Sequence, residues 1–421
     1  MLGIHDDGWS GLSANACALL MAADLVIGVE RMLAHVRPHL PPHCTLRAMD
    51  NALTATPAWI TAALDAGQQV ALLASGDPLC HGIGPFLIKQ LGARVRVEPA
   101  PSTLQLACAR FGTTWQDAVV ASCHGRDAGE WEIGATPAHG LYPLMRAIAR
   151  HPRVLAFTSP ANDPARLARA LILAGEADSL RLSVACRLRR ADEAVFRDLG
   201  VAEVAGMRFA TPNVVLVERI AKPAATLPVF GLADDAWQQR TPERGLLTKQ
   251  EARAVSLARL ALTPAACVWD IGAGSGAVGL ECARLAPLGH VWAIEKNAAD
   301  AVNARANAAR LAVTNYTLCE GRAPAGLEHW PDPDAVFIGG SDGELAALIA
   351  LALTRLRPGG RLVMNLVTLE NLATATTALG AAGVRWDVVQ LQASRSQPIL
   401  ALHRLAAHNP VWIVTATKEC A

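Results

Sequence analysis

The sequence predicts an α/β protein with more than one domain, and three features support this class. Short apolar runs alternate with stretches of helical periodicity along most of the 421 residues, which is typical of parallel β-sheets covered by helices. Two unlike glycine-rich loops, at 76–84 and 270–279, each follow an apolar run and precede a helical pattern. Pro and Ala crowd the stretch 222–228 between these loops, which indicates a linker. A chain of this length is expected to hold two or three domains.

The predicted N-terminal domain covers residues 1–221 and contains two αβ stretches. In the first stretch, buried strands and short helices are expected at Leu25–Gly28, Ala58–Leu64, Val70–Ala74 and Pro85–Leu91. Ser102 is predicted to cap a helix that extends to Ala109. In the second stretch, a strand, a helix and a closing strand are expected at Val154–Thr158, Pro164–Ala174 and Val214–Val217.

The predicted C-terminal domain covers residues 239–421, after a linker at 222–238, and its rhythm is more regular. Helices are expected at Lys249–Leu262, Val278–Leu285 and Ala299–Leu311. Strands are expected at Cys267–Ile271, His290–Ile294, Tyr316–Leu318, Ala335–Ile338, Arg361–Leu366, Val384–Leu391 and Val411–Ala416. This alternation predicts a doubly wound parallel sheet.

Composition argues against several classes of protein. Hydrophobic residues make up 52% of the chain, but no uncharged apolar run reaches the roughly 18 residues of a membrane span. The N-terminus lacks a basic segment followed by an apolar one, so we expect no secretory signal and a cytoplasmic protein. The ten cysteines form no C-x-x-C pair and no His/Cys cluster, so no metal site is predicted. A net charge of +1 predicts no nucleic-acid partner, and the high apolar content favours a homo-oligomer.

The loop at 270–279 is predicted to hold a cofactor. Gly272, Gly274 and Gly276 directly follow a buried strand, so the backbone can approach a ligand and present its amides to it. The pattern from Gly274 to Gly279 also satisfies the dinucleotide fingerprint, and Glu295 ends the next strand at the spacing of a ribose-binding acid. An NAD(P)-dependent oxidoreductase that uses the 272–279 loop therefore remains one hypothesis.

The stretch 268–276 resembles the first motif of the Rossmann-like S-adenosylmethionine-dependent methyltransferases. The resemblance implies that Asp270, before the first glycine, helps to orient the methionine end of the cofactor, and that Glu295 holds its ribose hydroxyls. Enzymes that methylate amino groups of nucleic acids usually carry (Asp/Asn)-Pro-Pro-(Tyr/Phe) at the end of the fourth strand. Here 334–340 ends in two glycines, which leave room for a bulky acceptor. An RNA methyltransferase remains a further alternative.

Three more motifs, at 245–253, 320–324 and 337–340, occur in the order found in the decarboxylating precorrin C-15 methyltransferases of corrinoid biosynthesis. The resemblance covers roughly 240–410. It implies cofactor contacts at Arg322 and Ala323, although Arg322 stands where the family commonly has an acid. By motif position alone, it puts candidate catalytic groups, and a proton donor for decarboxylation, at Thr248, Lys249, Glu251 and Arg253.

The N-terminal loop, 75–84, resembles the signature of the tetrapyrrole methylases, which bind S-adenosylmethionine between two αβ subdomains. Supporting motifs follow in family order at 101–105, 122–126 and 212–214. The resemblance covers about 1–221 and indicates the branch that methylates precorrins at C-5. It implies a second cofactor site with contacts at Gly76, Asp77, Pro78, Leu79, Gly82, Ser102, Leu104 and Asn213.

Two candidate catalytic residues of this domain are His81 and Arg126. Histidine exchanges protons near neutral pH, and a guanidinium can pair with a carboxylate of the acceptor. His81 and His124 both invite assignment as a general base, but their glycine-rich settings favour positioning roles. Only Met1 and Leu2 precede the first turn, so either the first strand is nearly absent or the true start lies upstream. If either activity is impaired, we expect it to be the one at C-5.

Together, the two resemblances are those of the fused, decarboxylating precorrin C-5,15-methyltransferases of aerobic cobalamin synthesis. They imply that the N-terminal domain methylates C-5 of precorrin-6B, a tetrapyrrole with several carboxylates. The C-terminal domain would methylate C-15 and remove carbon dioxide from the C-12 acetate, giving precorrin-8. Each domain is expected to bind its own S-adenosylmethionine.

Overall fold

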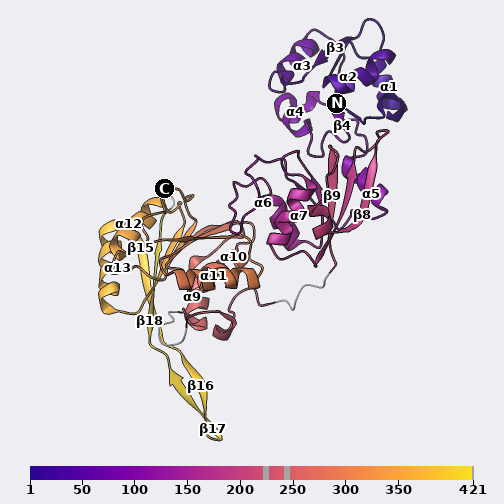
Figure 1. Ribbon diagram of the computed structural model, residues 1–421. Helices are drawn as coiled ribbons and strands as arrows, with labels where there is room; N and C mark the ends of the chain where they lie inside the picture. The colour runs from indigo at the N-terminus through magenta and orange to yellow at the C-terminus, as the bar shows by residue number, and fades with distance from the viewer. Residues whose placement is uncertain (221–226, 241–246, 420–421) are drawn as a thin grey trace. The chain divides into compact units, whose positions relative to one another are not determined.

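The computed structural model describes residues 1–220, 227–240 and 247–419, and the chain divides into two compact units (Figure 1). The N-terminal unit contains Met1–Asp127, Arg150–Ile172 and Glu176–Ala221. The C-terminal unit contains Ala128–Ala149, Leu173–Gly175 and Lys222–Ala421. In these described ranges, no helix combines the length and the apolar character needed to cross a bilayer.

The first half of the N-terminal unit is a parallel four-stranded sheet in the order β1-β4-β2-β3. Its strands are β1 (Leu2–Ile4), β2 (Leu25–Gly28), β3 (Thr45–Ala48) and β4 (Val70–Ser75). Its helices are α1 (Ala14–Met21), α2 (Glu30–Val36), α3 (Thr56–Asp65) and α4 (Gly84–Leu91), with 3-10 turns η1 (Gly8–Gly11), η2 (Arg37–His39) and η3 (Gly92–Arg94). Although β1 has only three residues, all are buried and pair with β4, so the short first strand is an integral part of the sheet.

Successive side chains of a strand point to opposite faces of the sheet, and helices cover both faces here. On β2, Val26 packs in one core with side chains of α1 and α2, whereas Ile27 packs in a second core with side chains of α3 and α4. Both faces of the sheet are therefore packed against helices, and a ligand site can form only at the loops that follow the strands.

The second half of the N-terminal unit is a mixed five-stranded sheet in the order β5-β6-β9-β7-β8. Its strands are β5 (Val119–Ser122), β6 (Arg153–Phe157), β7 (Leu180–Cys186), β8 (Ala194–Gly200) and β9 (Asn213–Arg219). Only β5 and β6 are parallel; the other pairs are antiparallel. The helices of this half are α5 (Thr103–Phe111), α7 (Pro164–Leu173) and α8 (Val201–Ala205), while α6 (Tyr142–Arg150) lies almost wholly in a segment grouped with the C-terminal unit.

The predicted cap at Ser102 is confirmed. Its hydroxyl accepts the Gln105 amide, and the Gln105 side chain accepts the Ser102 amide, which completes a capping box at the start of α5. This cap fixes the entry to α5 directly beside the 76–84 loop, because the carbonyl of Gly76 accepts the amide of Ala100.

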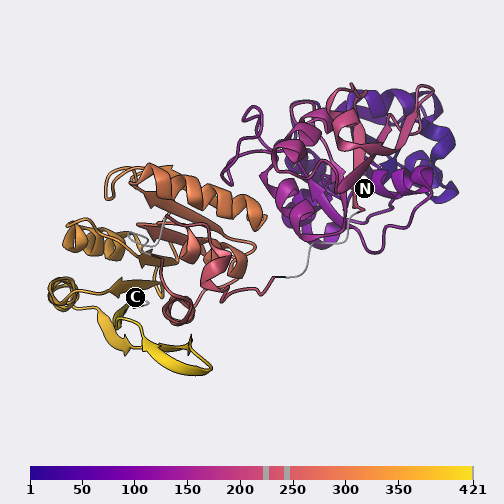
Figure 2. The same ribbon diagram turned by 60° about the horizontal axis from the view of Figure 1, so that its bottom comes forward.

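The C-terminal unit is built on a seven-stranded sheet in the order β12-β11-β10-β13-β14-β18-β15. Its strands are β10 (Cys267–Ile271), β11 (His290–Glu295), β12 (Tyr316–Glu320), β13 (Ala335–Ile338), β14 (Arg361–Leu366), β15 (Arg385–Leu391) and β18 (Val411–Thr417). Its helices are α9 (Gln250–Leu260), α10 (Ala277–Leu285), α11 (Ala298–Arg310), α12 (Leu345–Arg355) and α13 (Leu369–Ala382). Figure 2 shows helices on both sides of this sheet. Val268 packs with α9 and α10 in one core, and Trp269 packs with α12 and α13 in the other.

The predicted parallel sheet is confirmed except at β18, which runs antiparallel to both of its neighbours, β14 and β15. The reason is the connection. Between β15 and β18 the chain forms a hairpin of β16 (Ser394–Ile399) and β17 (Leu402–Ala407) instead of a crossover helix, and strands joined in this way pair antiparallel. This hairpin extends from the sheet (Figure 1), and Leu400 at its tip is fully exposed.

The sheet reverses its winding between β10 and β13. From β10 the chain proceeds outward to β11 and β12, and then returns to the other side of β10 to form β13 and β14. In open α/β sheets, ligands bind at such a switch point, outside the carboxyl ends of the strands. The loops after β10 and β13 are therefore where a ligand site is expected.

The predicted linker at 222–238 lies partly outside the described residues, at 222–226, as do Gly245 and Leu246 of the 245–253 motif. The segment from Gly231 to Trp237 already packs with the C-terminal core. The amides of Gly231 and Leu232 bind the buried Glu281 carboxylate, and Trp237 is 4% exposed, next to the 3-10 turn η4 (Asp234–Ala236).

Candidate active sites

The loop after β10 takes a backbone conformation that requires glycine. Gly272, Gly274 and Gly276 have φ angles of 72°, 56° and 79°, in the left-handed region. A Cβ on Gly272 would lie 2.7 Å from the backbone N and O of Gly340, so the loops after β10 and β13 touch backbone to backbone. A Cβ on Gly274 would meet nothing within 4 Å. Gly272 therefore joins the two strand ends, while Gly274 borders open space.

Behind this loop lie two buried polar atoms without a protein partner among the described residues: Asp270 Oδ1 and Tyr316 Oη. The other carboxylate oxygen of Asp270 accepts the Gly279 amide at 3.0 Å. Burial raises the pKa of Asp270 to about 7, against the opposing effect of the Gly279 amide, and the nearby Glu295 charge adds to the rise. Unpaired buried polar atoms are rare, so their position beside a glycine loop fits a site for a polar ligand.

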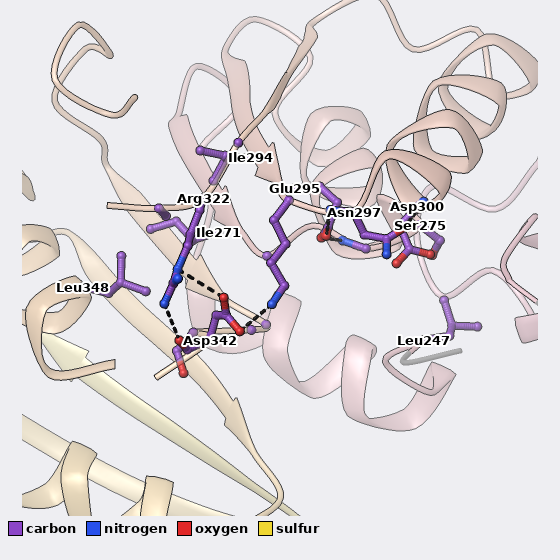
Figure 3. Close-up of a pocket in the computed structure, with 18 of the residues that line it drawn as sticks. Leu247, Ile271, Ser275, Ile294, Glu295, Asn297, Asp300, Arg322, Asp342 and Leu348 are labelled. Carbon is purple, nitrogen blue, oxygen red and sulfur yellow. Dashed lines mark hydrogen bonds and ion pairs between the residues drawn. The ribbon is translucent and has the colours of Figure 1, made fainter. Parts of the chain in front are cut away.

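Glu295, the last residue of β11, is the second acid of this site. Its carboxylate accepts the amides of Gly274 and Asn297, both at 2.8 Å, and so ties the glycine loop to the next strand. A cavity of about 340 Å³ opens beside it. Figure 3 shows side chains that line this cavity. Residues from the loops after β10, β11, β12 and β13 line the cavity, among them Ser275, Glu295, Asn297, Arg322, Ala323 and Gly340. The site thus combines a glycine cradle with a carboxylate that can accept hydroxyl hydrogens, which suits a nucleoside cofactor such as S-adenosylmethionine.

A group of ion pairs forms the rim of this cavity. Arg322 Nε lies 3.1 Å from Asp342 Oδ2, and Lys296 also pairs with Asp342 (Figure 3). The Lys296 ammonium lowers the pKa of Asp342, which stays ionised. The Arg322 side chain is thus held by an acid of the loop after β13, and it remains 58% exposed at the mouth of the site.

Of the four candidate catalytic residues at 248–253, none lines this cavity; their neighbour Leu247 does. Arg253 is fully buried, and its guanidinium donates to Glu281, to the carbonyl of Thr248 and to the carbonyl of Leu232. It therefore fastens the start of α9 to α10.

Glu251 forms a two-pronged ion pair with Arg395, at 2.9 and 2.6 Å, at the base of the β16–β17 hairpin. The hydrogen bonds from Arg395 lower the pKa of Glu251 to about 2, so the carboxylate is ionised at neutral pH. Lys249 is exposed at the N-cap of α9. The geometry favours structural roles for Arg253 and Glu251.

The N-terminal unit holds a larger cavity, of about 610 Å³, between its two sheets. The first subdomain contributes the loops after β2, β3 and β4, including Arg31, Asp77, Cys80, His81 and Gly82; the second contributes Ser102, Thr103, Ser122, His124 and Phe157. A smaller cavity of about 190 Å³ shares Arg31, Thr103, His124 and Phe157 and is also lined by His5 and Asn213. A site formed by two αβ subdomains is what the tetrapyrrole-methylase resemblance implies.

The 76–84 loop is folded around the carbonyl of Pro78. That carbonyl accepts the Gly84 amide at 2.9 Å, and a Cβ on Gly82 would lie 2.7 Å from the same oxygen. Asp77 Oδ1 accepts the Leu79 amide at 2.9 Å, which stabilises the turn. The glycines are thus needed for close backbone packing, and Asp77 holds the loop in shape.

The remaining predicted residues of this unit lie in different surroundings. Leu104 is buried in the core under α5, and Leu79 is 48% exposed. Asn213 starts β9, where Thr158 Oγ1 donates to its carbonyl at 2.9 Å. Arg126 is exposed in the loop after β5, outside both cavity linings.

Sequence reasoning did not select several residues that the structure brings to these sites. Lys296 follows β11 directly and Asp342 lies in the loop after β13, so their position after a strand was a usable signal. Tyr316 gave none, because an aromatic residue at the start of a strand usually packs in a core. Ser122 belongs to a recognised motif, as does His124, which was considered as a general base, but only the folded chain shows that both face the 76–84 loop.

Two family models match the chain, one over each part. Residues 3–201 match the tetrapyrrole (corrin/porphyrin) methylases, and residues 241–418 match the precorrin methyltransferase domain. The fold and the two sites therefore define an S-adenosylmethionine-dependent methyltransferase that acts on precorrins.

Comparison with individual proteins narrows the class. The chain is 34% identical to the precorrin-6Y C(5,15)-methyltransferase (decarboxylating) of a Sinorhizobium species, over 93% of this chain and 90% of the relative. It is 41% identical to the cobalt-precorrin-6B C(15)-methyltransferase (decarboxylating) of Salmonella typhimurium, over 41% of this chain and 90% of the relative. A solved precorrin-6Y C5,15-methyltransferase structure from Geobacter metallireducens is 39% identical, with a TM-score of 0.44, and covers 46% of this chain and 100% of that one. The chain belongs to the family of the precorrin-6Y C(5,15)-methyltransferases (decarboxylating), which replaces the oxidoreductase and RNA methyltransferase alternatives.

Proposed function

We propose that this chain adds one methyl group at C-5 and one at C-15 of precorrin-6B, and removes carbon dioxide from the C-12 acetate to give precorrin-8. The observation that carries the proposal is the presence of two separate glycine-loop cavities in one chain, of about 610 and 340 Å³. A chain with two such sites is better explained by two methyl transfers than by a single methyl transfer.

We assign the C-5 methylation to residues 1–221 and the C-15 methylation with decarboxylation to 239–421, each with its own S-adenosylmethionine site. The 34% identical relative carries both positions in its name. The Salmonella relative names C-15 alone and matches 41% of this chain, about the length of the precorrin methyltransferase domain matched at 241–418. This correspondence supports the division.

When bound, S-adenosylmethionine would supply an electrophilic methyl group on a sulfonium. The residues of the chain would bind and orient it. In the C-terminal unit, Glu295 would accept the ribose hydroxyls and the unpaired oxygen of Asp270 a polar group at the methionine end. Gly272, Gly274 and Gly276 would allow its close approach, and Arg322 and Ala323 would contact it from the loop after β12. In the N-terminal unit, the 76–84 loop and Ser102 have the same task. Catalysis then comes mainly from alignment and from exclusion of water.

Decarboxylation needs a proton for the carbon that loses its carboxylate. Arg253 and Glu251 are occupied by ion pairs. Thr248 and Lys249 are therefore the two candidates of the 245–253 motif that remain for proton delivery. Lys249→Met and Thr248→Val should slow product formation at the C-terminal site and leave methylation at C-5 unchanged.

The proposed function is tested by incubating the protein with precorrin-6B and S-adenosylmethionine and following the product mass. Two methyl groups gained and one carbon dioxide lost is the expected result. A product with a single methyl group, or with its carbon dioxide retained, would refute the assignment.

Three further parts of the proposal concern assembly and location. We propose a cytoplasmic homo-oligomer without affinity for nucleic acid, in line with the high apolar content and the net charge of +1. Light scattering should give a mass above that of one chain, and the protein should pass through heparin at low salt.

A further inference from the structure

The proposed methylation at C-5, on which this inference rests, requires the acceptor to lose a proton. A meso carbon of the acceptor carries one hydrogen, and the product carries a methyl group in its place. One proton must therefore leave this carbon for each methyl group added. A side chain in the N-terminal cavity that is neutral and holds a free lone pair would assist its departure.

Most titratable groups that face this cavity cannot accept a proton near neutral pH. Arg31 is cationic and paired with Asp6. The Asp77 carboxylate already accepts the Leu79 amide and holds the loop in shape. Burial, together with the charge of Asp77, raises the pKa of the Cys80 thiol, so that it stays protonated. Only His81 and His124 are left in the lining of the larger cavity.

His124 is the better placed of these two histidines, because its ring is held by a neighbour. Its Nδ1 lies 3.0 Å from Ser122 Oγ, and the same oxygen accepts the backbone amide of His124 at 3.4 Å. When Nδ1 carries the hydrogen and donates it to Ser122, the lone pair of Nε2 is free. His81 has a tilted ring contact with Phe157, at 5.3 Å, and its backbone is in the left-handed region with φ 54°. His81 thus packs against the wall of the site.

We propose that His124 is the base that takes the proton from the methylated meso carbon, and that Ser122 is a positioning residue that orients its ring. His124 lines the 610 Å³ cavity and the 190 Å³ cavity and faces the 76–84 loop across the larger one. No other imidazole in the lining of the larger cavity has a side-chain hydrogen-bond partner among the described residues.

The electrostatic surroundings keep His124 neutral. Burial lowers its pKa, and the neighbouring His81 lowers it further. The other groups that face it are the cation Arg31, the carboxylate of Asp77, the protonated Cys80 and, in the smaller cavity, His5 and Asp6. His5 is held by the carbonyl of Pro101, 2.8 Å from its Nε2. His124 is therefore in the form that accepts a proton at pH 7.

The proton step balances without an oxidant or a reductant. The C–H bond of the methylated carbon breaks, and its electron pair returns to the conjugated ring system. The proton moves to Nε2 of His124, and Nδ1–H of the resulting imidazolium donates to Ser122 Oγ. Water then takes the proton from the imidazolium and restores the neutral base.

The first test compares His124→Ala with His43→Ala, an exposed histidine outside both cavities. In a single turnover with the full chain, His124→Ala should slow methylation at C-5 by about 10²–10⁴-fold, as expected for loss of a general base. Methylation at C-15 by the same chain is the internal control and should be unchanged, and added imidazole should restore part of the C-5 rate. A C-5 rate equal to that of His43→Ala would overturn the proposal.

The second test concerns Ser122 and the ionisation of His124. An NMR titration of the His124 ring, without substrate, should give a pKa below 6.5, and Ser122→Ala should lower it further because the imidazolium loses its acceptor. The pH midpoint of the C-5 rate should move in the same direction, and Ser122→Thr should restore it. An unchanged midpoint in Ser122→Ala would refute the positioning role. If the wild-type chain methylates C-15 but never C-5, the proposed function itself fails at this site.

Discussion

Two glycines of the C-terminal loop should lose stability to different extents on the same substitution. Gly272 and Gly274 are two residues apart, and both have a left-handed backbone, with φ 72° and 56°. An alanine in this conformation costs about 1 kcal/mol, whichever position it occupies. The two sites differ in their surroundings, because a Cβ at 272 would lie 2.7–2.9 Å from the backbone of Gly340, whereas a Cβ at 274 would meet nothing within 4 Å.

The magnitudes follow from this difference. Gly274→Ala should lower the free energy of unfolding by about 1 kcal/mol, from the backbone term alone. Gly272→Ala adds an overlap with backbone atoms that cannot rotate away, for which overpacking costs of about 1–3 kcal/mol are typical. Its total loss should therefore be about 2–4 kcal/mol. Affinity for S-adenosylmethionine should show the reverse order. Gly274→Ala should weaken binding more than Gly272→Ala, because its new methyl group enters the cavity itself.

The assay is hydrogen exchange of peptides from β10 and β13 in the full-length chain, which reports local stability. Calorimetric titration of the same variants gives ligand affinity. Peptides from the N-terminal unit are the control and should be unaffected. Equal losses of stability in the two variants, or a loss of ligand binding without destabilisation in Gly272→Ala, would refute the backbone contact between the loops after β10 and β13.

Three further predictions address other parts of the structure. Glu281→Ala removes the nearer carboxylate partner of the buried Arg253 guanidinium, 3.1 Å away, while Asp234 remains at 3.4 Å; it should cost about 3–5 kcal/mol in urea unfolding, and a cost under about 1 kcal/mol would show that the pair is not buried. Asp270, with a pKa raised from 3.8 to about 7, should make the C-terminal unit progressively less stable as pH rises from about 4 to 7, with no further loss above 7. Asp270→Asn should remove this pH dependence, and an unchanged profile in denaturant titrations would contradict it. Asp77→Ala removes the acceptor of the Leu79 amide and should abolish methylation at C-5 while product mass still records methylation at C-15 and loss of carbon dioxide.

The glycine loop, the helix cap and the strand boundaries could be predicted, because each depends on residues only a few positions apart in the sequence. The loop after β10 needs glycine at three positions, and the sequence provides them directly after an apolar strand. The capping box at Ser102 depends on a residue only three positions away. The boundaries of β10 and β13 agree with the predicted strands for the same reason, since alternation and apolar content are visible within a few residues.

What could not be predicted depends on partners far away in the sequence. The reversed direction of β18 follows from a hairpin between β15 and β18, where the pattern showed only separate strands. β8 was missed because it carries Arg197 and Asp198 on an exposed edge. Arg253 was selected by its motif, but its partner Glu281 lies on the next helix, and only the fold shows that the two form a buried pair. Arg322 likewise meets Asp342 through the order of strands in the sheet.

The central claim is that one chain holds two independent sites for the same methyl donor, and calorimetric titration of the full-length protein with S-adenosylmethionine tests it most directly. The account predicts a stoichiometry of two per chain. Asp77→Ala and Gly274→Ala should each weaken one site and leave the other unchanged. A stoichiometry of one in the wild-type chain, or two variants that weaken the same site, would contradict it.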